Sequence, residues 1–138
     1  MLISLSAAVL VLLPFIIPYF FVSIEERGGP VPFSLLPSLL IFALFGNYLE
    51  ELLFRGFLQT HLMQQGMSKT RRILLSGLFF SMGHLFLAAT VTDLGALILI
   101  FTLWEGIICA AIYEKYGLMS ATLTHGMAIF LLASGVVI

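Results

Sequence analysis

A chain of 138 residues that is 61% hydrophobic and 9% charged is too apolar for a water-soluble domain, in which about 45–50% of residues are apolar and about 25% are charged. Its formal net charge of −1 and its lack of a basic run also argue against nucleic acid as a partner. The lipid bilayer is the environment that fits this composition, and backbone inside it must form helices or closed barrels. Because the long apolar runs do not alternate as barrel strands do, we expect an all-α, polytopic integral membrane protein.

Five transmembrane helices are predicted along the chain, since each span needs about 20 mostly apolar residues. The predicted spans cover residues 2–24, 32–66, 70–90, 94–113 and 118–138. The first has no basic residue before it, so we interpret it as a retained span rather than a cleaved signal peptide, followed by a polar loop at 25–30. The second is too long for one straight crossing at about 1.5 Å per residue, and its polar end is expected at the membrane interface.

Basic residues in short loops predict the orientation of the spans. The loops at 66–72 and 114–117 lie on one side by alternation and hold Lys69, Arg71, Arg72 and Lys115. The opposite side offers Arg27, which is flanked by Glu25 and Glu26. We therefore expect both basic loops and the N-terminus in the cytoplasm and the C-terminus outside, with the chain in the plasma (inner) membrane.

Ionisable residues also lie deep inside the predicted spans, where a charge costs at least about 2.5–3.5 kcal/mol and usually has a function. They are Glu50, Glu51 and Arg55 on the second span, His84 on the third, Glu105 on the fourth and His125 on the fifth. At about 1.5 Å per residue, Glu50, His84 and His125 lie ~24, ~21 and ~10 Å from the cytoplasmic ends of their helices. These depths allow the three side chains to meet in one water-accessible site.

Helix geometry separates the two neighbouring glutamates of the second span. Glu51 and Arg55 stand four residues apart in the order that favours an ion pair, and Arg55 cannot lose its charge, so we expect a structural, bracing pair. Glu50 points about 100° away around the helix and is left as a candidate general base. A single histidine in a span often makes only a helix-to-helix hydrogen bond, but two histidines with an unpaired glutamate favour a catalytic site. Glu105 is left without an assigned role.

Three short motifs follow one another along these spans. The first is Glu50-Glu51-Leu52-Leu53-Phe54-Arg55-Gly56, the second is Phe80-Ser81-Met82-Gly83-His84, and the third comprises Gly106, Tyr113, Gly117 and His125. In this order they resemble the EExxxR, FxxxH and G…Y…G…H motifs of the CAAX protease and bacteriocin-processing family, also called the Abi family. The resemblance covers residues 36–138, about three-quarters of the chain. We therefore expect a single membrane domain, 1–138, with an extra N-terminal span and loop at 1–30 and a CAAX-protease-like core at 36–138.

The resemblance implies an intramembrane glutamate-type endopeptidase, similar to the CAAX prenyl proteases, that cleaves a prenylated tail or a small peptide at the membrane. In the family the leading glutamate and the FxxxH histidine activate a water molecule, which assigns Glu50 and His84 to this role on the cytoplasmic side. The third-motif histidine, here His125, stabilises the oxyanion together with an asparagine four residues later. That position is Ile129 in this chain. Because losing one oxyanion donor typically costs about 10²–10³ in rate, we expect reduced activity.

The sequence leaves alternatives open. No cofactor is expected, although two histidines and a glutamate could ligate zinc, and we keep zinc as a second interpretation of the site. A catalytically impaired family member acting in bacteriocin immunity or as a membrane scaffold is one alternative function, which Ile129 favours. Another is a small proton-coupled transporter, because intramembrane Glu and His residues also form proton relays. The chain is short for the family, so a homo-oligomer that closes the site is a further prediction.

Overall fold

The computed structural model describes residues 1–21, 23, 31–91 and 95–135, and every regular element among them is helical. The elements are α1 (Leu2–Phe20), a 3-10 turn η1 (Phe33–Leu35), α2 (Leu36–Glu51), a π-helical segment η2 (Leu52–Gln59), α3 (Thr60–Gln64), α4 (Lys69–Gly83), a second π-helical segment η3 (Leu87–Val91), α5 (Ala96–Tyr116) and α6 (Leu118–Ser134). The all-α prediction is confirmed. The polar loop predicted at 25–30 and the last residues of the fifth predicted span, 136–138, lie outside the described residues.

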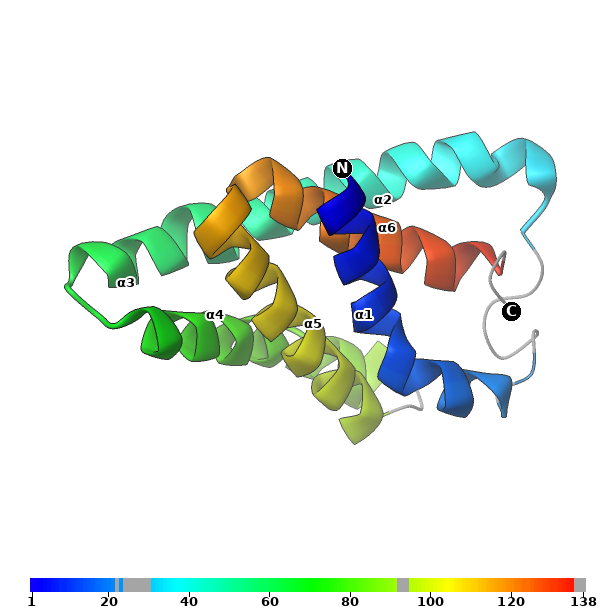
Figure 1. The fold of residues 1–138 in the computed structure, drawn as a ribbon. Helices are drawn as coiled ribbons and strands as arrows, with labels where there is room; N and C mark the ends of the chain where they lie inside the picture. Colours follow the sequence, from blue (N-terminus) through cyan, green and yellow to red (C-terminus); the bar gives the residue numbers. More distant parts are fainter. Residues whose placement is uncertain (22, 24–30, 92–94, 136–138) are drawn as a thin grey trace.

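One long helix forms the frame of the molecule. From η1 through α2, η2 and α3 the helix runs without a break over 32 residues, Phe33–Gln64, and α4 returns beside it (Figure 1). The turn between α3 and α4 contains Gly66 with φ +75°, a left-handed conformation that glycine adopts without a steric penalty. The second predicted span is therefore a single helix that exceeds the length of one crossing, as its residue count indicated.

The five predicted spans are all helical, although they differ in length. Three helices are long and apolar enough to cross a membrane, Phe33–Gln64, Lys69–Val91 and Ala96–Tyr116. Two shorter apolar helices, Leu2–Ile17 and Leu118–Ser134, correspond to the first and last predicted spans. The 17 residues of α6 stand at the lower limit for a crossing, about 17 residues. The chain is an integral membrane protein.

The side chains are distributed as expected for a protein in a bilayer and not as in a water-soluble protein. Large apolar side chains on α2 and η2 point outward, and Phe42, Phe45 and Phe57 are each more than half exposed. The interior instead holds ionisable groups, and Arg55 is the largest fully buried side chain of the described chain. Since a charge inside a membrane protein is costly, the buried residues must compensate one another.

Two close helix crossings bring these polar groups together. Where α4 crosses α5, a Cβ on Gly106 would lie 3.0 Å from the Cα of Gly77. Where α2 crosses α6, a Cβ on Gly126 would lie 3.2 Å from the Cα of Leu44. Small residues at such crossings allow helix backbones to approach closely in membranes. Because Gly106 and Gly126 each directly follow an ionisable residue, the two crossings also determine where those ionisable side chains meet α2 and α4.

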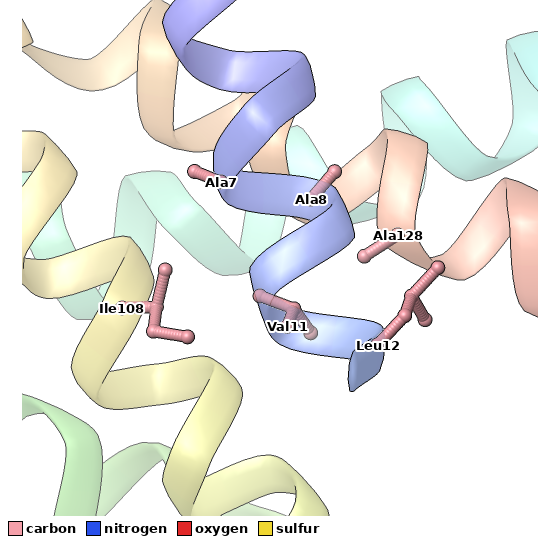
Figure 2. Packing of buried hydrophobic residues seen from close by; sticks show 6 residues of the cluster. All are labelled: Ala7, Ala8, Val11, Leu12, Ile108 and Ala128. Atoms are coloured by element: carbon pink, nitrogen blue, oxygen red, sulfur yellow. The ribbon is translucent and has the colours of Figure 1, made fainter. Parts of the chain in front are cut away.

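The N-terminal helix packs onto the remaining bundle instead of standing apart from it. Figure 2 shows its small and branched side chains facing α5 and α6. The cluster consists of Ala7, Ala8, Val11, Leu12, Ile108 and Ala128. The Trp104 indole on α5 also donates a hydrogen bond to the Leu10 carbonyl, at 3.3 Å. The extra N-terminal helix therefore covers a face of α5 and a face of α6, and the cluster that it forms with them contains no motif residue.

Candidate active site

Glu50 and His84 face each other from two helices. Glu50 lies in the last turn of α2 and His84 directly follows α4. The distance from Glu50 Oε2 to His84 Nε2 is 3.8 Å, and their side chains are 41% and 20% exposed, respectively. Glu50 Oε2 is itself buried and has no hydrogen-bond partner within the described part of the chain. The structure thus brings together two of the three residues whose depths allowed them to meet, while their catalytic roles stay predictions.

The ring of His84 is oriented by its own helix. Its Nδ1 lies 2.9 Å from the Phe80 carbonyl oxygen. A carbonyl oxygen only accepts hydrogen bonds, so Nδ1 carries the proton in this contact, and in the neutral ring the lone pair is left on Nε2. The lone pair therefore points toward the carboxylate of Glu50.

A second group, which we call the buried cluster, consists of Glu51, Arg55, Glu105 and His125. The predicted ion pair is present, with 3.1 Å between Arg55 Nη1 and Glu51 Oε1 and both side chains fully buried. Arg55 Nη2 also donates to the carbonyl of Gly106 on α5, at 2.9 Å. The pair therefore connects the long helix to α5 as well as stabilising its own turn.

His125 belongs to this buried cluster and not to the exposed pair. Its Nδ1 lies 2.9 Å from Glu51 Oε1, and its Nε2 lies 3.7 Å from Glu105 Oε2. The side chain is 3% exposed, so the expectation that it would line a water-accessible site with Glu50 and His84 is wrong for this structure. The reason is the close crossing at Gly126, which presses α6 against α2 and directs the neighbouring imidazole into the bundle.

The ring of Phe80 contacts both groups. Its centroid lies 4.7 Å from that of His84 and 5.3 Å from that of His125, and the Arg55 guanidinium carbon lies 4.6 Å from it. A cation beside an aromatic ring in a dry interior is stabilised by the ring electrons. In the sequence, Phe80 stood out only as the first residue of the second motif. No spacing rule predicted that its ring would contact both His84 and His125.

A π-helical segment begins directly after the two glutamates, at Leu52–Gln59. Such segments are rare and are frequent at functional sites. Within it Gln59 is buried, and its Nε2 donates to the Ala110 carbonyl at 3.1 Å and to Glu114 Oε1 at 2.8 Å. The sequence analysis missed Gln59, although its spacing of four residues from Arg55, which itself follows Glu51 by four, could have indicated it.

A separate polar network ties the helix ends near the α3–α4 turn. Arg72 Nη2 donates to Glu114 Oε2 at 2.6 Å, and the hydroxyls of Thr60 and Tyr113 lie 2.7 Å apart. Sequence reasoning treated Arg72 and Glu114 only as charges of two loops. Their ion pair joins α4 to α5, and Gln59 connects it to the long helix.

The donor groups of the zinc interpretation do not converge on one point in this structure. Within residues 1–21, 23, 31–91 and 95–135, no group of three or more His, Cys, Asp or Glu side chains is placed to hold a metal ion. His84 and His125 instead face different carboxylates, Glu50 and Glu51 respectively. Zinc therefore stays an alternative prediction for this site.

Comparison with known proteins identifies a family. The model of the family described as type II CAAX prenyl endopeptidase Rce1-like matches residues 32–131. The matched region contains Glu50, His84 and His125 as well as Ile129, and it leaves out α1. No curated protein and no solved structure matches the chain.

Proposed function

The chain belongs to the Rce1-like family of type II CAAX prenyl endopeptidases, and we propose that it is a glutamate-type intramembrane endopeptidase whose catalytic pair is Glu50 and His84. The family supports a CAAX-type protease that acts in the membrane on prenylated peptides or proteins. The observation that carries the finer proposal is the partly exposed pair itself, with an unpartnered Glu50 oxygen 3.8 Å from the His84 ring nitrogen.

The spacing of the pair suits one shared water molecule. A water at about 2.8 Å from both acceptor atoms forms a triangle on the 3.8 Å line between Glu50 Oε2 and His84 Nε2. One water proton would point to each atom, and the oxygen lone pairs would face away toward a substrate carbonyl. Glu50 then acts as the general base and His84 orients the water.

The proposed reaction balances without a cofactor. Glu50 takes a proton from the water, and the hydroxide adds to the scissile carbonyl carbon. The tetrahedral intermediate expels the amine, which receives the proton from Glu50, and the carboxylic acid formed then passes its own proton to the amine, so the products are a carboxylate and an ammonium group. His125 is the proposed oxyanion donor, because its Nε2 lies 3.7 Å from Glu105, beyond hydrogen-bond distance. Since the ring is buried, this donation requires the substrate to displace the side chains that cover it.

A non-catalytic role is the second candidate, and Ile129 is the observation that favours it. Position 129 lies one turn beyond His125 on α6, where an asparagine in the family supplies the partner amide. A family member without that amide could act in immunity or as a scaffold while keeping the fold. The intact pair of Glu50 and His84 favours the peptidase.

Cleavage of defined peptides distinguishes the two candidates. Purified protein in lipid nanodiscs is given matched CAAX peptides with and without a prenyl group, and the products are identified by mass spectrometry. Wild type should cleave the prenylated peptide, while Glu50→Gln should lose about 10²–10⁴-fold in rate, since an amide cannot accept the proton. His61→Gln is the control, because His61 is exposed and lies outside the proposed site. A silent wild type, or equal rates for wild type and Glu50→Gln, contradicts the proposed mechanism.

A further inference from the structure

The buried cluster contains more acids than fixed cations. Glu51 and Arg55 are fully buried, while Glu105 and His125 are 1% and 3% exposed at their side chains. With both glutamates ionised and a neutral imidazole, the four groups carry a net charge of −1. A net charge in a dry interior is strongly disfavoured, whereas a paired and neutral set is tolerated. The cluster therefore requires one additional proton, which Glu105 or His125 must hold.

The hydrogen bond to Glu51 fixes the proton on one of the two ring nitrogens of His125. Glu51 Oε1 is 3.1 Å from the Arg55 guanidinium and 2.9 Å from His125 Nδ1. An arginine-paired carboxylate acts as an acceptor, so Nδ1 must be the donor. In a neutral ring, Nε2 would then direct its lone pair at Glu105 Oε2, 3.7 Å away. Placing the proton on Nε2 replaces this repulsion with an attraction.

We propose that Glu105 is a positioning residue that holds His125 as an imidazolium, with both ring nitrogens protonated. Its role in catalysis rests on the proposed function above. Hydrogen bonds from a charged donor are roughly twice as strong as those from a neutral donor. A charged His125 therefore offers the oxyanion a stronger donor in a chain where Ile129 provides no second one. Glu105 lies in none of the three motifs, and its role is inferred from the packing around His125.

Glu105 is also the carboxylate that faces the second ring nitrogen of His125, Nε2. The titratable groups that face His125 or its immediate neighbours are Glu50 and Glu51 of α2, Arg55 of η2, His84 after α4, and Glu105 and Cys109 of α5. Glu51 is shared with Arg55, and Glu50 faces His84. Glu105 Oε1 has no hydrogen-bond partner among the residues that the structure describes. Removing this one charge should therefore release the proton on Nε2 and leave the Glu51 contact in place.

Nitrogen NMR of the imidazole rings tests the proposal without a substrate. The chain has 3 histidines, so ¹⁵N-histidine labelling in nanodiscs gives a simple spectrum, assigned with His61→Gln and His84→Gln. At pH 7 both nitrogens of His125 should be protonated in wild type, and Glu105→Gln should leave one protonated. Glu105→Asp, which restores the charge, should return part of the population to the doubly protonated form. Glu114→Gln on the same helix is the matched control and should change nothing at His125.

Two NMR results would overturn the proposal. A singly protonated His125 in wild type contradicts it even if no variant folds, and a doubly protonated ring in folded Glu105→Gln contradicts it as well. If the ring behaves as expected but no peptide is cleaved, the proposed function fails and the inference on Glu105 stands.

The rate gives a second readout for an active enzyme. Glu105→Gln should lower kcat by about 10²-fold, the typical effect of losing one oxyanion donor, with KM nearly unchanged. The alkaline limb of its kcat profile should move to lower pH, because the ring loses its proton more readily without the facing carboxylate. An equal loss at every pH, with the limb unmoved, would indicate a merely structural role and would overturn the assignment.

Discussion

The Glu50–His84 pair and the buried cluster contact the same aromatic ring, Phe80, yet they are constructed differently. The pair is partly exposed, and its two facing atoms stand 3.8 Å apart. In the buried cluster every residue is at most 3% exposed, and contacts of about 3 Å join three helices. An accessible pair is suited to binding water and substrate, whereas a buried network with short contacts between helices is suited to holding those helices and a fixed charge. The comparison therefore predicts that mutations in the pair affect activity and mutations in the cluster affect stability first.

The largest effect on stability is expected at Arg55. Arg55→Leu removes the fixed cation from a buried pair and leaves the buried cluster with one uncompensated carboxylate, which typically costs about 3–5 kcal/mol. Denaturant or thermal unfolding in detergent micelles measures the loss. Arg71→Leu is the matched control, because Arg71 is exposed and should unfold like wild type. If Arg55→Leu is as stable as the control, or if Glu50→Gln is equally destabilising, the division between the two regions is wrong.

The next effect concerns the crossing that places His125. Gly126→Ala inserts a Cβ 3.2 Å from the Cα of Leu44, and overpacking of this kind typically costs about 1–3 kcal/mol. Gly46→Ala on α2 meets no atom within 4 Å and should instead stabilise the helix by up to about 1 kcal/mol. Melting temperatures of the two variants should move in opposite directions. A Gly126→Ala protein that melts no lower than wild type would show that the crossing is not tightly packed.

A smaller effect, in the opposite direction, is expected at Ile129. Ile129→Asn lies on the same face of α6 as His125, because four residues advance a helix by about 400°, and its amide could donate a second hydrogen bond to the oxyanion. We expect kcat to rise about tenfold, equivalent to about 1.4 kcal/mol. The peptide assay measures this, with Glu50→Gln as the silent background for both versions. Equal inactivity of folded wild type and Ile129→Asn would support the non-catalytic candidate.

The last prediction concerns membrane topology and not free energy. It tests which side of the membrane the Glu50–His84 pair faces. The basic loops predict that residues 66–72 are cytoplasmic, so Ser68→Cys should resist a membrane-impermeant thiol reagent in intact cells and react after permeabilisation. The native Cys109 is buried, which keeps the background low. Rapid labelling of intact cells would reverse the proposed orientation.

Features that depend on one helix could be predicted from the sequence. Hydropathy located all five helices, and a spacing of four residues predicted the contact of Glu51 with Arg55. Depth along the helices also placed Glu50 beside His84. These inferences need only the rise and the period of an ideal helix, applied to residue positions that are read from the sequence.

Features that depend on how helices rotate against one another could not be predicted. The contact of His125 with Glu51 and Glu105 follows from the crossings at Gly106 and Gly126, whose angles no single-chain pattern encodes. The π-helical segment, Leu52–Gln59, likewise shifts its side chains around the helix relative to an α-helical projection. For this reason the sequence analysis placed His125 in an accessible site, and it could not assign Glu105.

The length of the long helix has a consequence for the kinetics. Its 32 residues, Phe33–Gln64, extend about 48 Å, more than a hydrocarbon core of about 30 Å accommodates at usual tilts. With the Phe33 end placed at one edge of the hydrocarbon core, Glu50, about 26 Å along the helix, would lie near the opposite boundary with the headgroups. The proposed prenylated substrate would hold its peptide at that boundary through its lipid chain, so protein and substrate would meet by lateral diffusion. The rate should then follow the mole fraction of substrate in the bilayer, and adding inert lipid at constant bulk substrate should slow the enzyme.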